Sequence, residues 1–136
     1  MAKAIAAQIE KTEAELNQLG SDDALAVAKR LKAARESFVR VVEFVVGSMK
    51  SSPNAVFAGS VPYLLMAGRL VAGWQLGRSL LVATELAAKG QDAPFMQAKI
   101  VTARFFAEHV LNGVPATADS IVDGAESATA MTLDAF

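Results

Sequence analysis

The spacing of the prolines constrains this chain more than any other feature, because a proline inside a helix or a strand interrupts it. The four prolines stand far apart, at Pro53, Pro62, Pro94 and Pro115. Alanine, the residue that favours the helix most, supplies 27 of the 136 residues. The sequence therefore predicts an all-α fold of long helices separated by proline-containing turns.

The periodicity of the apolar residues places these helices. Four of the expected helices are long, and a connector over 52–60 separates the second from the third. We therefore expect an antiparallel four-helix bundle with a short fifth C-terminal helix, which together form a single helical domain over 1–136. The expected helices cover 2–19, 23–51, 61–88, 94–112 and 116–123.

Residues that favour helix ends flank these segments. Gly20 suits a C-cap, because glycine adopts positive φ without steric cost. Ser21 or Asp22 can cap the second helix by accepting hydrogen bonds from its free amides, Ser60 can cap the third, and Asp92 the fourth.

Two segments are apolar on nearly every side, the stretch 38–46 and the whole helix 61–88. Such a helix is buried on several sides, so we expect 61–88 to be the central and most buried helix. Four helices alone do not cover so much apolar surface, which predicts that one face packs against further protein. The aromatic residues at helical spacing are expected in the core: Tyr63, Trp74, Phe95, Phe105 and Phe106.

Composition narrows the function. The net charge of −1 shows no basic excess of the kind that nucleic-acid binders carry. The chain has no cysteine and one histidine, His109, which argues against disulfides, thiolate nucleophiles and the usual zinc and di-iron sites. No signal peptide or membrane helix is recognisable. We expect a soluble cytoplasmic protein with no nucleic-acid partner and no membrane partner.

Two arginines on the apolar third helix are the most unusual charged residues. Arg69 and Arg78 are nine residues apart, which places them on opposite faces of a helix. They therefore cannot clamp one anion within this chain. Because a buried arginine needs a partner, we expect structural ion pairs with Glu85, Glu108 or Glu43, or contact with a missing partner surface.

The other candidates also have simple structural interpretations. Gly73 and Gly77 lie on one helix face, which predicts the close approach of another backbone or of a flat ligand, and tight packing between helices is the favoured interpretation. Glu108 and His109 are adjacent and therefore point in different directions. There is no Glu-x-x-His pair and no glycine-rich nucleotide loop. We assign no catalytic, cofactor-binding or metal-binding residue.

A group of short runs carries a family resemblance: YLLMAG at 63–68, GW at 73–74, AK at 98–99, TARFFAEHVL at 102–111, and an ending that starts with GAES at 124–127. Together they resemble the extra C-terminal helical domain of the long bacterial acyl-CoA dehydrogenases, a group that includes enzymes of the methylthiopropanoyl-CoA dehydrogenase type. The resemblance covers most of the chain and is strongest from Ser60 onward.

The resemblance implies an FAD-dependent parent enzyme that converts an acyl-CoA into a trans-2-enoyl-CoA. In that family the glutamate base, the FAD site and most CoA contacts lie in upstream domains. It therefore implies that 1–136 is an excised or separately encoded C-terminal accessory and interface domain of a flavoenzyme, with no cofactor of its own. Neither Glu108 nor Glu126 matches the motif of the base.

The partners that the resemblance implies are the upstream dehydrogenase domains, a second copy of the chain, or both. The alternative is a stand-alone helical bundle that serves oligomerisation or holds an apolar ligand in its core.

Overall fold

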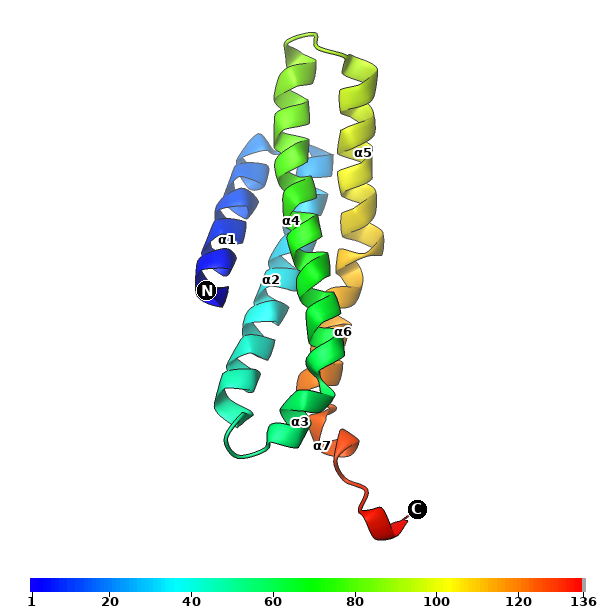
Figure 1. The fold of residues 1–136 in the computed structure, drawn as a ribbon. Helices are drawn as coiled ribbons and strands as arrows, with labels where there is room; N and C mark the ends of the chain where they lie inside the picture. The colour runs from blue at the N-terminus through cyan, green and yellow to red at the C-terminus, as the bar shows by residue number, and fades with distance from the viewer. Residues whose placement is uncertain (136) are drawn as a thin grey trace.

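A computed structural model describes residues 1–135, and within them the chain is helical and contains no strand. The prediction of an all-α fold is confirmed. Figure 1 shows an elongated arrangement in which each long helix runs opposite to the one before it. The elements are α1 (Ala2–Leu19), α2 (Asp22–Ser48), α3 (Pro53–Ala58), α4 (Ser60–Ala88), α5 (Ala93–His109), η1 (Leu111–Gly113), α6 (Val114–Val122), α7 (Ala125–Ala128) and η2 (Leu133–Ala135).

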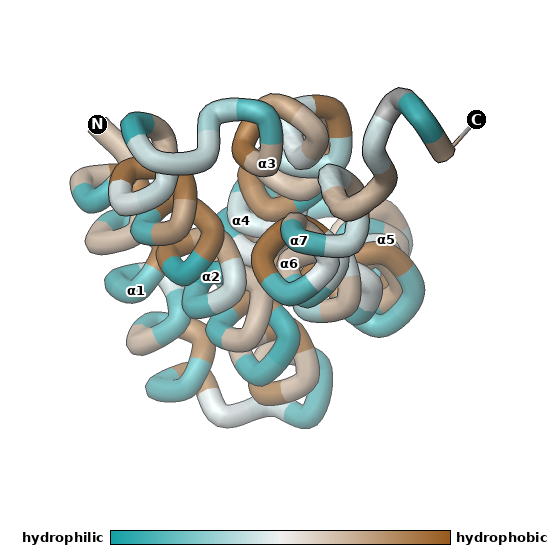
Figure 2. The backbone as a smooth tube through the Cα atoms, turned by 90° about the horizontal axis from the view of Figure 1, so that it is seen from below, coloured by the Kyte–Doolittle hydropathy of each residue, from teal (hydrophilic) through white to brown (hydrophobic). Residues whose placement is uncertain are grey.

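Helix α6 continues the direction of α5 after the 3₁₀ turn η1. Together α5 and α6 span the length of α4 (Figure 1). Seen from below, α1 lies at one side and α5 at the other, with α2, α4 and α6 between them (Figure 2). No helix within residues 1–135 is both long enough and apolar enough to cross a bilayer.

The prediction that 61–88 is the central and most buried helix holds in part: α4 packs against α1, α2, α5 and α6, but it is not the most buried, since it buries six of its 29 residues and α2 buries seven of its 27. Helix α2 packs against α1, α4, α5 and α6. Its buried face is rich in alanine, including Ala24, Ala28 and Ala34, and small side chains let neighbouring helices approach closely. Helix α4 instead leaves Leu64 and Leu65 exposed. An apolar circumference does not specify which sides of a helix its neighbours cover.

The cap predictions are mostly confirmed. Gly20 ends α1 with φ of 71°, the Ser21 hydroxyl accepts from the Ala24 N–H at 3.3 Å, and the Asp92 carboxylate accepts from the Phe95 N–H at 3.4 Å. The prediction for Ser60 is wrong, because the residue is already helical and no side chain caps α4.

Two helix boundaries differ from those expected. Helix α2 ends at Ser48, and the predicted connector contains the helix α3, which has Pro53 in its first turn, where the missing N–H costs no hydrogen bond. The fourth expected helix ends at His109, because the chain tightens into η1 before α6 begins at Val114.

One continuous core joins the long helices. Ile9 and Leu16 of α1 meet Val27 and Leu31 of α2, and Leu80 of α4 is buried in the same cluster. Tyr63, Trp74 and Phe106 pack partly buried against it. The predictions for Phe95 and Phe105 are wrong, because both rings lie on the outer side of α5 and are more than half exposed.

Candidate functional site

The two arginines of α4 do not form one anion site together. Both are exposed. Arg78 donates to Oε1 of Gln75 at 3.1 Å, and its guanidinium carbon lies 5.7 Å from the centre of the Trp74 ring. Within residues 1–135, neither Arg69 nor Arg78 forms an ion pair with Glu43 or another carboxylate. The predicted ion pairs are therefore wrong, because exposure removes the need for a partner.

The other two proposed carboxylates pair elsewhere. Glu85 binds Lys89 one turn later, and that hydrogen bond lowers the pKa of Glu85. Glu108 accepts from Nε of Arg104 at 3.2 Å, while Nη1 of Arg104 donates to Asp23 at 3.1 Å. The Asp23 bond, followed by the Glu108 bond, raises the pKa of Arg104. This network joins α5 to the start of α2.

Glu108 and His109 do not form an acid–base pair. The exposed His109 ring stacks on Phe105 with 4.4 Å between ring centres, while Glu108 is held by Arg104. Among the described residues, no three His, Cys, Asp or Glu side chains gather in a way that could hold a metal ion. That this chain carries no catalytic, cofactor-binding or metal-binding residue stays a prediction.

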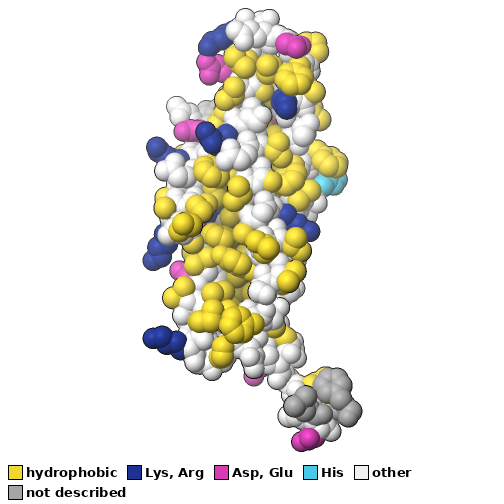
Figure 3. Space-filling view, viewed as in Figure 1, with side chains coloured by type: hydrophobic (Ala, Val, Ile, Leu, Met, Phe, Trp, Pro, Cys, Tyr) yellow, Lys and Arg dark blue, Asp and Glu magenta, His cyan; other side chains and the backbone are white. Residues whose placement is uncertain are grey.

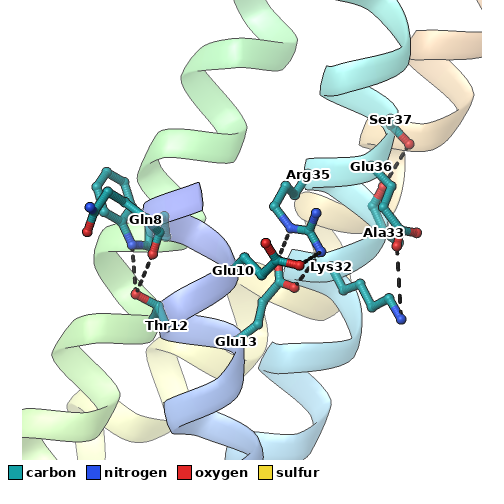
Figure 4. Close-up of polar contacts among 10 residues, drawn as sticks. Gln8, Glu10, Thr12, Glu13, Lys32, Ala33, Arg35, Glu36 and Ser37 are labelled. Atoms are coloured by element: carbon teal, nitrogen blue, oxygen red, sulfur yellow. Dashed lines mark hydrogen bonds and ion pairs between the residues drawn. The ribbon is translucent and has the colours of Figure 1, made fainter. Parts of the chain in front are cut away.

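A largely buried ion pair that was not predicted from the sequence joins α1 to α2. Arg35 Nε donates to Glu13 Oε1 at 2.7 Å, and Arg35 Nη2 donates to Glu13 Oε2 at 2.9 Å (Figure 4). The side chains are only 13% and 7% exposed, and the Glu13 hydrogen bond raises the pKa of Arg35. Glu13 lies on the buried side of α1 between Ile9 and Leu16. A carboxylate within an apolar stripe is the sequence feature that could have predicted a buried ion pair.

A second polar contact joins α1 to α4. Trp74 Nε1 donates to the Thr12 hydroxyl oxygen at 2.9 Å, and that hydroxyl lies 3.4 Å from the Gln8 carbonyl (Figure 4). Thr12 is buried and Trp74 is partly buried. The hydroxyl is thus both acceptor and donor, which gives this contact a structural role.

We expect Thr12→Val to lower the free energy of unfolding by about 1 kcal/mol, because the indole N–H loses its acceptor while the side-chain volume stays the same. Trp74 is the one tryptophan, so its fluorescence follows denaturant unfolding directly. The matched control is Thr84→Val, since Thr84 donates only within its own helix, to the Leu80 carbonyl at 2.9 Å. Equal losses in the two variants would contradict the structural role of the Thr12 contact.

The prediction of close packing at the two glycines is confirmed, but the atoms that approach them belong to side chains and not to another backbone. A Cβ atom at Gly73 would lie 2.6 Å from Leu111 Cδ1, and one at Gly77 would lie 3.3 Å from Leu16 Cδ1. These glycines therefore admit the side chains of neighbouring elements into the surface of α4.

A large hollow of about 720 Å³ lies where α3, α7 and the ends of α2 and α6 meet. Ser48, Ser51 and Ser52 line it, together with the carboxylates Asp123 and Glu126. No histidine or lysine stands among its lining residues to activate a serine. The hollow therefore does not assemble a nucleophile and base of the usual kind.

A large apolar surface lies along α2, α3 and the first half of α4, and we call it the α2–α4 face. It contains two grooves that share Tyr63, of about 290 and 350 Å³, and both are open. Figure 3 shows hydrophobic side chains gathered there, with basic side chains at the margins. The grooves are lined by Val42, Val45, Val46, Met49, Val56, Phe57, Gly59, Ser60 and Ile121 on one side of Tyr63, and by Met1, Ala2, Ile5, Phe38, Ala67, Leu70 and Val71 on the other.

Comparison with known proteins agrees with the resemblance seen at 63–68 and 102–111. The family model described as "Acetyl-CoA dehydrogenase C-terminal like" matches residues 2–132. The chain is 42% identical over 126 residues to 3-methylmercaptopropionyl-CoA dehydrogenase of Ruegeria pomeroyi. That match covers 93% of this chain but 21% of the relative, in its C-terminal region. No solved structure gives a significant match.

Proposed function

Because the chain belongs to the acetyl-CoA dehydrogenase C-terminal-like family, we propose that it is the accessory and interface domain of an FAD-dependent acyl-CoA dehydrogenase. The chain spans about a fifth of the length of the relative, 21%. The proposed parent reaction is the α,β-dehydrogenation of an acyl-CoA to a trans-2-enoyl-CoA, carried out by residues outside these 136. The match to the C-terminal region of a dehydrogenase is the observation that carries this proposal.

The proposed unit is a single domain over 1–136, in which α1, α2, α4 and α5 form an antiparallel four-helix bundle and α6 is the short fifth helix. The continuous core that joins these helices supports it. Upstream dehydrogenase domains are the proposed partner, in the cytoplasm, where acyl-CoA substrates are available. A net charge of −1 offers no electrostatic attraction to nucleic acid, so no such partner is proposed.

Neither the two grooves of the α2–α4 face nor the large hollow suits FAD. The pyrophosphate of FAD needs cationic side chains or free amides, and no Lys, Arg or His lines either groove of the α2–α4 face. In the large hollow, Asp123 and Glu126 would repel a pyrophosphate. Flavin chemistry in the parent enzyme is therefore proposed to depend on other domains. The proposed role of this chain is to pack against those domains.

We expect the purified chain to retain no flavin after incubation with FAD and desalting, as measured by flavin absorbance. The full-length relative, treated in parallel, is the positive control. Retention of one FAD per chain would overturn the proposal that this domain takes no direct part in cofactor binding.

A stand-alone bundle that oligomerises or binds an apolar ligand is the second candidate function. The two open grooves beside Tyr63 favour it. These grooves are open and do not form an enclosed cavity of the kind that holds an apolar ligand. Measuring whether the isolated chain self-associates distinguishes this candidate from the first.

A further inference from the structure

We infer that the α2–α4 face is the surface on which this domain docks to the dehydrogenase body, meaning the part of such an enzyme that lies outside the family match. The inference rests on the proposed function and adds the location and the chemistry of the contact. The partner surface is apolar and belongs to the same polypeptide.

The first argument is the composition of the face. Val46, Phe57 and Leu64 are 74%, 60% and 71% exposed. No charged residue occurs from Ser51 to Gly68, which covers α3 and the beginning of α4. Monomeric soluble proteins rarely expose a continuous apolar surface beyond a few hundred Å². A surface with so few charges is suited to an apolar partner and not to an ionic one.

The second argument is the position of the N-terminus. Met1, Ala2 and Ile5 line one of the two grooves together with Tyr63 and Val71. The relative matches in its C-terminal region, so its preceding chain enters at this end of the domain. A tethered neighbour has a high effective concentration at surfaces near its attachment point. The attachment at the N-terminus therefore holds the dehydrogenase body close to the α2–α4 face.

The third argument is the contrast with the other exposed apolar residues. Phe95, Val101 and Phe105 lie on the outer side of α5. Lys99 Nζ lies 5.2 Å from the centre of the Phe95 ring, and His109 stacks on Phe105. Polar side chains of the same helix thus already cover part of these rings. The α2–α4 face has no such cover, so it is the better docking surface.

The test is a chimera in which this chain replaces the matched region of the Ruegeria pomeroyi relative, with a specific protease site inserted before Met1. After cleavage, the wild-type domain is expected to co-elute with the flavin-containing body in gel filtration. The variant Val46→Lys/Leu64→Lys is expected to reduce the co-eluting fraction at least about 10-fold, in line with the loss of interface anchors. The matched control Val101→Lys/Phe105→Lys adds the same charge on α5 and is expected to co-elute normally.

Folding of the variants is checked on the isolated chains by circular dichroism. Val46 and Leu64 are exposed helical residues, and lysine favours the helix more than valine does, so melting is expected to stay near that of the wild type. If only Val101→Lys/Phe105→Lys releases the domain, the assignment of docking to the α2–α4 face is wrong, while the proposed function is unaffected. A wild-type chimera that does not fold, or that does not hold flavin, would overturn the proposed function and the face together.

The isolated chain gives a further decisive outcome. Sedimentation is expected to show weak or no self-association. A stable dimer that Val46→Lys/Leu64→Lys converts to monomer would assign the face to a second copy of the chain and overturn the inference.

Discussion

Glu13→Ala is expected to lower the free energy of unfolding by about 3 kcal/mol, because it leaves the Arg35 guanidinium partly buried without its forked partner. Both hydrogen bonds between the two side chains, of 2.7 and 2.9 Å, are lost. The Glu10 carboxylate lies 3.7 Å from Arg35 Nη2, but its side chain is 67% exposed, so it replaces only part of the lost interaction. Urea unfolding followed by circular dichroism measures the loss.

The matched control is Glu36→Ala. Glu36 lies 3.9 Å from Lys32 on the surface of α2, and both side chains are more than half exposed. Removing an exposed pair of this kind changes stability by less than about 0.5 kcal/mol. Similar losses in Glu13→Ala and Glu36→Ala would show that burial of the Arg35 pair does not matter.

A double replacement separates packing from charge. Glu13→Leu combined with Arg35→Met removes both charges and keeps apolar volume between α1 and α2, so its loss is expected to be smaller than that of Glu13→Ala. A loss in the double variant equal to or above that of the single one would contradict the account of an orphaned charge.

The raised pKa of Arg35 fixes the direction in which this contact makes the free energy of unfolding depend on pH. The Glu13 hydrogen bond raises the folded pKa of Arg35 above its ordinary value. A raised pKa contributes stability that is present at lower pH and is lost only as the pH rises through the folded value. That value lies in strongly alkaline solution, so Arg35 itself produces no change in stability between weakly acidic and weakly alkaline conditions.

The extent to which sequence predicts this structure depends on whether a feature is local. The caps at Gly20, Ser21 and Asp92 depend on residues within one turn, and all three were predictable. The pairing of Glu13 with Arg35 joins residues 22 apart on different helices. Periodicity places Glu13 on a buried face but does not say which cation meets it there.

The sequence predicted that an apolar surface would be left uncovered, but it did not predict which part of the molecule carries that surface. The apolar circumference of 61–88 indicated that more protein must cover it. Only the structure shows that α4 shares the centre with α2 and is left open near Leu64. The exposure of Arg69 and Arg78 explains the error for these two residues, since both were expected to be buried because their neighbours in sequence are apolar.

Gly73→Ala is expected to destabilise the fold by about 1–2 kcal/mol, although alanine is the better helix former. The new Cβ would stand 2.6 Å from Leu111 Cδ1 and 2.8 Å from its Cγ, well inside van der Waals contact. Leu111 is fully buried in η1, so it cannot swing into solvent. The overpacking cost of about 1–3 kcal/mol exceeds the gain in helix propensity, which is at most about 1 kcal/mol. Thermal and urea unfolding measure the difference.

Gly68→Ala on the same helix is expected to have the opposite sign. Nothing lies within 4 Å of a Cβ built at Gly68, so only the gain in helix propensity, up to about 1 kcal/mol, remains. A third variant identifies the clash: Leu111→Ala alone costs about 3 kcal/mol through the cavity it leaves. Since the new Cβ at position 73 partly fills that cavity, the double variant Gly73→Ala/Leu111→Ala loses less than the sum of the two single losses. Strict additivity, or stabilisation by Gly73→Ala, would mean that the close approach of Leu111 to α4 does not limit the residue at position 73.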